Sequence, residues 1–488
     1  MRISMIAQMV VAALTTCAAA SAAPRVRAVV EVAAQPSTPN TAARTVSGFL
    51  YLNRCSGDCN IHGATTNSAS AHTTSIPPPG EYRVGEFATA AGLTGAAADA
   101  DWVAVVQCVK EVYSPFAVTV SDVVPTGVVY NEAVIAGQPS DIARPIDNLG
   151  VAPIASDCSP QDNVLSFSFA NHHSGTGAAR IRDICWTAAQ ESAHAYGLDH
   201  EFAFTDGTSA CRDVMTYRED CGGQRFFRDQ SARCGELAVR GCRCGGTQNS
   251  HRLLLAAFGA GTPTTAQPTV SITTPIAGSS VEPRFAVHAS AGAQRGVAKV
   301  ELFLNGSRWN TVPGAAFGPA GQGDPVTHSS DYVLQVPADV PDGIIDITVI
   351  ASDDLGIAAS SAPVTVTKGS PCSDASQCAA EQKCEEGRCF WDAPTAELGD
   401  ECAYSQACKT WECADTGDGK HCVTGCQLGE STSCPEGFAC TDTVGARRVC
   451  ISSDTGGCCS AGRAHQPWGA VVIGIAVLGF LIRPRPRA

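Results

Sequence analysis

The sequence is poor in charge and lacks several common functional motifs. Asp, Glu, Lys and Arg make up 16% of its 488 residues, and the net charge is -14. No run rich in Lys and Arg occurs before the last few residues, which argues against a nucleic-acid partner. Phosphate-binding loops, dinucleotide-binding glycine patterns and the G-x-S-x-G motif are also missing. Nucleotide-dependent enzymes and serine hydrolases of that type are therefore not indicated.

Cysteine, by contrast, is abundant, with 25 residues. In an exported protein this number indicates disulfides, whereas in a reducing compartment it would indicate zinc ribbons. The N-terminus favours export, because an apolar stretch follows Arg2 and Ala20-Ser21-Ala22 fits a cleavage site. We therefore predict a signal peptide over residues 1–22. A lipoprotein leader ending at Cys17 is the alternative.

The C-terminus has the pattern of a surface anchor. An apolar run from Trp468 to Ile482 follows Cys458 and Cys459 and precedes several arginines. The run is shorter than the roughly 20 residues of a usual spanning helix. This tail resembles the C-terminal sorting signals of myxobacterial surface proteins, which implies processing near the two cysteines. We expect residues 456–488 to anchor the protein in a membrane, with the arginines on the cytoplasmic side.

Three blocks lie between these ends. Residues 45–260 mix helical and strand patterns, including an apolar helix face near Trp102. Residues 268–367 alternate apolar and polar positions between turn dipeptides, which predicts an all-β sandwich. This second block resembles the Ig-like modules of bacterial surface proteins and would serve as a spacer or an adhesion module. Residues 372–450 hold an even number of cysteines among few apolar residues, which predicts a disulfide module of undetermined pairing, acting as a stalk or a binding module.

One stretch of the first block carries metal chemistry. A helical pattern leads into Gln190, so positions 190 and 194 lie one turn apart on the same helix face. Gly197 ends the helix, since glycine accepts left-handed dihedrals, and the chain turns back. His200 can then reach the space that Gln190 and His194 face. Glu191 lies beside them, where a carboxylate can polarise a metal-bound water.

The stretch resembles the metzincin zinc motif H-E-x-x-H-x-x-G-x-x-H. Four of its motif positions match, at Glu191, His194, Gly197 and His200. The resemblance implies an α/β metalloprotease-like domain over residues 45–260. Zinc would be the cofactor, held by the histidines, and Glu191 would act as the general base.

A second element of the same family follows the motif. Met215 and Tyr217 stand where metzincins have their Met-turn. The resemblance implies that Met215 lies beneath the zinc and that Tyr217 binds the metal or steadies the transition state. It also implies that an edge strand, expected at Val164–Ala170, pairs with extended substrate.

The sequence departs from the family at the first ligand, where Gln190 replaces a histidine. In one interpretation His194, His200 and the Gln190 amide oxygen still hold zinc, with Tyr217 or water completing the site. In another the metal is lost and the domain persists as a binding fold. A third interpretation treats the motif as a chance match on a structural surface protein. The neighbouring His172-His173 pair could supply a ligand, but we favour an ordinary loop.

We therefore expect an exported cell-surface protein that resembles a zinc metalloprotease and acts on a peptide or protein. In the active form, Glu191 would take a proton from zinc-bound water and pass it to the leaving amine. Tyr217 would support the oxyanion. The alternative is a catalytically inactive surface binding or adhesion protein that keeps the metzincin-like fold.

Overall fold

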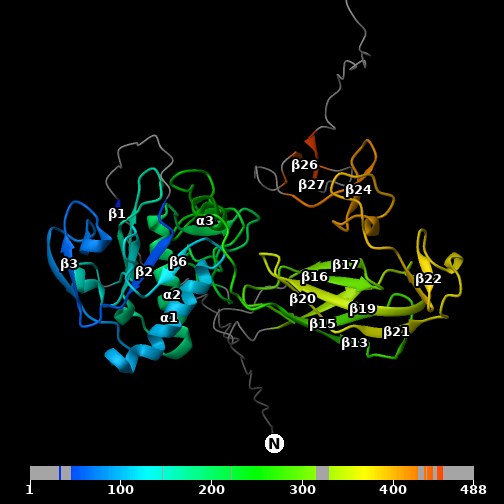
Figure 1. Cartoon of the computed structure of the whole chain (residues 1–488), viewed down its shortest axis with the longest axis horizontal. Coiled ribbons are helices and arrows are strands. Elements are labelled where there is room, and N and C mark those ends of the chain that lie inside the picture. The colour runs from blue at the N-terminus through cyan, green and yellow to red at the C-terminus, as the bar shows by residue number, and fades with distance from the viewer. Residues whose placement is uncertain are drawn as a thin grey trace, which may run out of the picture. The chain divides into compact units, whose positions relative to one another are not determined.

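The computed structural model describes residues 32–33, 46–145, 147–220, 222–314, 329–426, 434–435, 437–442 and 448–453 (Figure 1). The chain divides into two compact units, Met1–Phe390 and Trp391–Ala488. The predicted signal peptide (1–22) and C-terminal anchor (456–488) lie outside the described residues. Among the described residues, no helix is long and apolar enough to cross a membrane.

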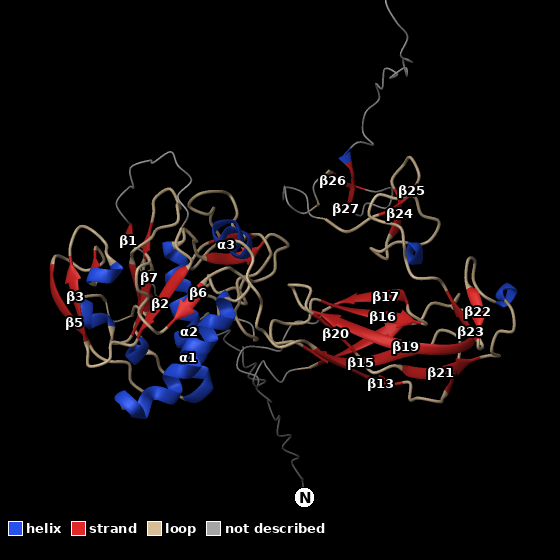
Figure 2. Ribbon diagram, in the orientation of Figure 1, coloured by secondary structure: helices blue, strands red, loops and turns tan. Residues whose placement is uncertain are grey.

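The first unit begins with a domain built on a five-stranded sheet of order β6-β2-β7-β10-β8. Figure 2 labels β2, β6 and β7 of this sheet. Four of its strands are parallel: β2 (Phe49–Asn53), β6 (Thr119–Ser121), β7 (Asn131–Ile135) and β10 (Leu165–Ser168). Every residue of β7 and β10 is buried, as expected for parallel strands covered on both faces. The fifth strand, β8 (Gly150–Val151), pairs antiparallel with β10.

The position of β10 corrects one expectation. A strand does form within Val164–Ala170, but it lies inside the sheet, between β7 and β8. The sheet edge next to β10 is instead formed by β8, which has only two residues. A strand this short has too little pattern to be recognised in a sequence.

Two helices pack together beside this sheet, α1 (Asp99–Tyr113) and α2 (Gly177–Ala195). The apolar face predicted for the first helix is confirmed, since Trp102, Val105 and Val109 are buried. A disulfide between Cys108 and Cys185 ties the two helices together. Their contact forms the centre of the main hydrophobic core, which extends to Met215 and Phe227.

Smaller elements complete this domain. They are β1 (Val32–Ala33) with β9 (Pro153–Ile154), the sheet of β3 (Cys59–Gly63), β4 (Thr73–Thr74) and β5 (Gly80–Val84), the pair β11 (Glu201–Phe204) and β12 (Ala232–Cys234), and α3 (Ser250–Phe258). Further disulfides join Cys55 to Cys59, Cys158 to Cys244 and Cys234 to Cys242.

The rest of the first unit contains the predicted β-sandwich. One sheet has the order β13-β15-β18, and the other β14-β21-β19-β16-β17, with β20 also paired to β19. The strands are β13 (Thr269–Thr274), β14 (Ser280–Val281), β15 (Ala286–Gly292), β16 (Lys299–Leu304), β17 (Ser307–Pro313), β18 (Ser330–Gln335), β19 (Gly343–Ser352), β20 (Ala358–Ser360) and β21 (Val364–Lys368). Val287 and Leu334 of one sheet share a core with Leu302 and Ile347 of the other, so the sandwich prediction is confirmed.

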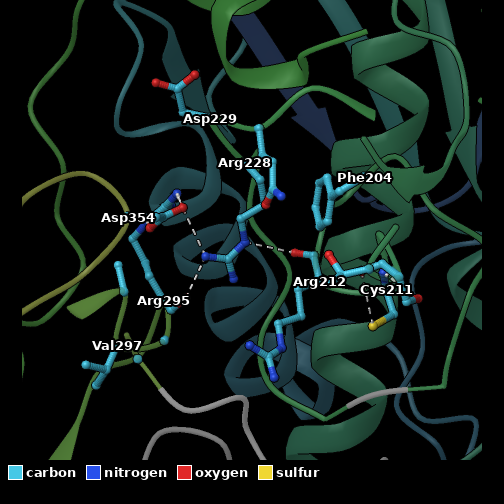
Figure 3. Close-up of a pocket in the computed structure, with 14 residues that line it drawn as sticks. Phe204, Cys211, Arg212, Arg228, Asp229, Arg295, Val297 and Asp354 are labelled. Atoms are coloured by element: carbon cyan, nitrogen blue, oxygen red, sulfur yellow. Dashed lines mark hydrogen bonds and ion pairs between the residues drawn. The ribbon is translucent and has the colours of Figure 1, made fainter. Parts of the chain in front are cut away.

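Three charged side chains are among those that join the N-terminal domain to the sandwich. Arg228 and Arg295 both reach the carboxylate of Asp354, at 3.0 Å and 2.7 Å, along the wall of a cavity (Figure 3). Arg228 also donates to the Arg295 carbonyl at 2.5 Å, and the Arg295 side chain is fully buried over the Phe226 ring. We call Arg228, Asp354 and Arg295 the arginine clamp.

The predicted cysteine module contains three repeats of one disulfide pattern. In each repeat of four cysteines the first pairs with the third and the second with the fourth. The bridges are Cys372–Cys384 and Cys378–Cys389, then Cys402–Cys413 and Cys408–Cys422, then Cys426–Cys440 and Cys434–Cys450. The division between the two units falls after the first repeat, inside the range predicted as one module.

Each repeat ends in a small hairpin whose two strands carry its third and fourth cysteines directly opposite each other. The hairpins are β22 (Lys383–Glu385) with β23 (Arg388–Phe390), β24 (Cys413–Asp415) with β25 (Lys420–Cys422), and β26 (Phe438–Asp442) with β27 (Arg448–Ser452). The first hairpin docks on the sandwich, where Arg388 donates to Asp346 at 2.8 Å.

Candidate metal centre

The turn after α2 brings two predicted ligands together. Gly197 has a φ of +90°, and its N–H donates to the His194 carbonyl at 2.9 Å, which ends the helix as predicted. A Cβ at this position would lie 2.0 Å from the Cys158 carbonyl oxygen, so no other residue fits. The reversed chain places His200 Nε2 at 2.9 Å from His194 Nε2.

The hydrogen bonds on the far side of each ring define which nitrogens carry hydrogen. His194 Nδ1 lies 2.7 Å from the Leu198 carbonyl oxygen, and His200 Nδ1 lies 3.1 Å from a carboxylate oxygen of Glu236. Both partners only accept, so each Nδ1 donates, and a ring that carries a single hydrogen then has its lone pair on Nε2. Two lone pairs that face each other at 2.9 Å repel unless a cation, either a metal ion or a proton, lies between them.

The protonation of His194 is shifted in the direction that metal ligation needs. Burial, reinforced by the neighbouring His200, lowers the pKa of His194 to about 3. The ring is therefore neutral at physiological pH, and neutral imidazole is the form that binds metals.

Gln190 and Glu191 are both buried on α2, with exposed fractions of 2% and 0%. The Gln190 Nε2 atom and both Glu191 carboxyl oxygens have no hydrogen-bond partner among the described residues. Burial raises the pKa of Glu191 well above its ordinary value. Buried polar atoms without partners are rare in proteins, and they concentrate where a ligand or ion is missing.

A glycine of the edge strand closes one side of the Glu191 side chain. A Cβ at Gly150 would lie 2.6 Å from Glu191 Cγ and 2.8 Å from its Oε1. Sequence reasoning did not single out Gly150, because nothing in the local pattern links it to Glu191.

The turn that carries Met215 and Tyr217 lies next to His200. The Tyr217 ring centroid is 4.2 Å from that of His200, and Met215 is fully buried. The Met215 carbonyl accepts from the N–H of Glu201, while the Met215 N–H donates to Asp213. The turn is therefore fixed to the strand that begins directly after His200.

The histidine pair that the sequence offered as a spare ligand source is elsewhere. His172 and His173 follow β10, and in the part of the chain that the structure describes neither belongs to a cluster of metal-ligating groups. The clustered cysteines of the three repeats are likewise no metal sites, because they are disulfide-bonded.

Two important residues were missed by sequence reasoning, Glu236 and Arg240. Carboxylates of Glu236 and Asp199 lie near His200 in an arrangement that could suit a cation. Arg240 already occupies that position, since it donates to Asp199 and to Glu236 at 2.5 Å each. The acidic group is therefore neutralised by an arginine, and any metal belongs on the Nε2 side of the histidines. Glu236 is 36 residues from His200 in the sequence, and no local sequence pattern predicts the contact.

The two imidazole Nε2 atoms are of a type that binds zinc. Zinc accepts imidazole nitrogen and side-chain oxygen in a four-coordinate site, and catalytic sites leave one position for water. His194 and His200 offer the two nitrogens, and Gln190 lies one helical turn before His194 on α2.

Comparisons with known proteins find similarity to parts of the chain. The solved structures that align with parts of the chain include the fibronectin(III)-like modules of Clostridium thermocellum CbhA (18% identity, 21% of this chain, 96% of that chain, TM-score 0.15) and LPMO10B from Micromonospora aurantiaca (16% identity, 19% of this chain, 56% of that chain, TM-score 0.14). No curated protein matches the chain. Residues 268–349 match the family described as bacterial Ig domain, so a mostly β, disulfide-rich chain contains an Ig-like domain at these positions.

Proposed function

We propose that residues 45–260 form a zinc-dependent, metzincin-like peptidase domain in which His194 and His200 hold the metal. The observation that carries the proposal is the 2.9 Å distance between His194 Nε2 and His200 Nε2, with a hydrogen-bond acceptor at the Nδ1 atom of each ring. Gln190 supplies the third protein ligand through its amide oxygen. This ligand is weaker than the imidazole it replaces, so we expect modest metal affinity.

Zinc, when bound, supplies Lewis acidity and lowers the pKa of water. A general base must be ionised, and burial raises the pKa of Glu191, so a bound cation nearby would favour the form that the reaction needs. Glu191 would then accept the proton of the attacking water and pass it to the leaving amine. Tyr217, in contact with His200, donates to the oxygen on which negative charge develops.

We further propose that the protein works outside the cytoplasm, on a peptide or protein at the cell surface. Ten disulfides within the described residues support an oxidising compartment. The expected leader and anchor agree with this location.

A binding protein without catalysis is the second candidate. It is favoured by the burial of Gly150, Val151 and Glu191, because an extended substrate at β8 would have to displace whatever covers that edge. The replacement of a ligand at Gln190 points in the same direction. In this case the domain would recognise a surface partner and keep its buried site as a remnant.

Zinc stoichiometry tests the first candidate. The oxidised chain from Ala23 onward is purified without chelator, and its zinc content is measured by elemental mass spectrometry. We expect close to one zinc per chain, lost in His194→Ala and in His200→Ala. His288→Ala is the matched control, because His288 is an exposed histidine of the sandwich. A wild-type chain that holds no zinc even after metal addition would end the catalytic proposal.

A histidine restored at position 190 separates the two candidates. Gln190→His should raise zinc affinity, since imidazole replaces an amide oxygen in the coordination sphere. If wild type and variant both cleave a broad peptide library, the protein is an enzyme. If only the Gln190→His variant cleaves the peptides, the natural protein is a binding protein derived from an enzyme.

A further inference from the structure

A short disulfide-closed loop adjoins the candidate metal centre. Strands β11 and β12 pair next to His200, and the chain then forms a loop that the Cys234–Cys242 disulfide closes. At the start of the loop the N–H of Gly235 donates to the His200 carbonyl at 2.9 Å. Across the loop, the N–H of Arg240 donates to the Cys234 carbonyl at 2.7 Å. The loop is thus attached to the backbone of a proposed ligand.

Glu236, within this loop, reaches the His200 ring. Its Oε1 atom lies 3.1 Å from His200 Nδ1 and 2.5 Å from Arg240 Nη2. Arg240 also makes two bonds to Asp199, at 2.5 Å and 2.7 Å, and Asp199 accepts from the His200 N–H at 2.8 Å. A carboxylate, a guanidinium and a second carboxylate therefore hold both the ring and the backbone of His200.

The geometry of Glu236 suits this role. Its Oε1 atom accepts from His200 Nδ1 and from Arg240, so the hydrogen of His200 stays on Nδ1. A carboxylate on the far nitrogen fixes the tautomer and orientation of a ligand histidine and increases its basicity. His194 has only a backbone carbonyl in the equivalent place.

We propose that Glu236 is the positioning residue for His200, holding its Nε2 atom toward a metal ion, with the disulfide-closed loop as the support. The inference rests on the proposed zinc site, and it assigns to the loop a role in metal affinity. If Glu236 were merely a surface partner of Arg240, its removal would change stability slightly and leave metal binding unchanged, because exposed ion pairs contribute little.

The test compares two variants with wild type. Zinc affinity is measured by competition with a chromophoric chelator on the oxidised chain, and folding is checked by thermal unfolding. We expect Glu236→Ala to weaken zinc binding about 10- to 100-fold. Glu236→Gln keeps an acceptor oxygen without the charge, so its zinc affinity should lie between those of wild type and Glu236→Ala.

Asp229→Ala is the matched control. Asp229 is a carboxylate of similar exposure, 34% against 37% for Glu236, and it is likewise held by an arginine, Arg252, at 2.6 Å. It should bind zinc as wild type does. Equal zinc affinity in wild type and Glu236→Ala would overturn the inference while leaving the zinc site intact.

A second measurement separates this failure from that of the zinc site itself. The nitrogen-15 chemical shifts of the His200 ring report its tautomer in the metal-free protein. We expect hydrogen on Nδ1 in wild type and a mixture of tautomers in Glu236→Ala. If the wild-type protein binds no zinc, both the proposed zinc site and the proposed role of Glu236 in metal binding are overturned, whatever the tautomer of His200. A tautomer unchanged by the substitution overturns the positioning role by itself.

Discussion

At the scale of single residues, Glu191 is a carboxyl whose chemistry is changed by burial. It is fully buried, its oxygens have no partner among the described residues, and Gly150 leaves no room beside it. An ordinary core position would hold an apolar side chain, because a buried carboxyl without a hydrogen bond is costly. The cost is explained if the residue serves a site, since functional residues are often retained at the expense of stability.

The contact between Gly150 and Glu191 can be tested by substitution. We expect Gly150→Ala to destabilise the protein by about 1–3 kcal/mol, because the added methyl group overlaps Glu191. Chemical denaturation measures the free energy of unfolding. Adding Glu191→Ala should remove most of this penalty in a double-mutant cycle. Gly246→Ala, where nothing lies within 4 Å of the new Cβ, should be nearly neutral. Equal losses at Gly150 and Gly246 would refute the contact.

Removal of the buried carboxyl provides a second residue-scale prediction. We expect Glu191→Leu to stabilise the metal-free protein by roughly 1–3 kcal/mol, because an apolar side chain replaces a polar group without partners. Thermal and chemical unfolding in the presence of chelator would show it. A destabilised variant would mean that the carboxyl makes an important interaction in the metal-free state.

At the scale of elements, the C-terminus of α2 determines the geometry of the centre. Gly197 must adopt a positive φ, and it passes so close to the Cys158 carbonyl that a Cβ would lie 2.0 Å away. That carbonyl cannot retreat easily, because Cys158 is bridged to Cys244. The turn thus depends on a residue type visible in the sequence and on a neighbour 39 positions earlier (197 − 158).

Two glycine-to-alanine substitutions separate these effects. Gly197→Ala should cost at least about 3 kcal/mol, because backbone strain and steric overlap add. Gly175→Ala, at a similar φ of +86° but with nothing within 4 Å, should cost only the strain of about 1–2 kcal/mol. Unfolding by urea measures both. Similar losses in the two variants would show that the Cys158 contact is unimportant.

At the scale of the whole molecule, the Ig-like domain is joined to the N-terminal domain through buried charges. Burial alone would raise the pKa of Asp354, but Arg228 and Arg295 outweigh it and lower the value to about 2. Arg228 also donates its backbone N–H to Asp213, the residue that holds Met215. The sandwich therefore contributes to the support of the candidate centre as well as extending the chain.

The arginine clamp makes stability depend on acid. Because the folded pKa of Asp354 lies below that of the unfolded chain, this carboxylate stabilises the fold above about pH 4. The contribution, about 2 kcal/mol, is lost as the pH falls toward 2. Asp354→Asn should lower stability at pH 7 and reduce the loss between pH 4 and 2. Asp339 is an exposed residue of the sandwich, so the control Asp339→Asn should change neither the stability at pH 7 nor the loss of stability between pH 4 and 2. An Asp354→Asn curve parallel to wild type in acid would contradict the clamp.

Some features are determined by the local sequence. The helix face at Trp102, the helix end at Gly197 and the alternation of the sandwich strands follow from residue type and spacing, which act over a few positions. The Ig-like fold could therefore be predicted. The even number of cysteines in residues 372–450 likewise allowed a disulfide module to be predicted. The approach of His200 to His194 was expected for the same reason, since only six positions separate them.

Other features depend on contacts between distant segments. The first-to-third and second-to-fourth cysteine pairing, the edge position of β8 and the contact of Glu236 with His200 have no local signal. Packing decides them, because each needs two segments to meet that only the folded core brings together. The sequence by itself thus determined which residues could form a metal centre. Only the tertiary structure decided which groups orient them, because hydrogen-bond partners are set by proximity in space.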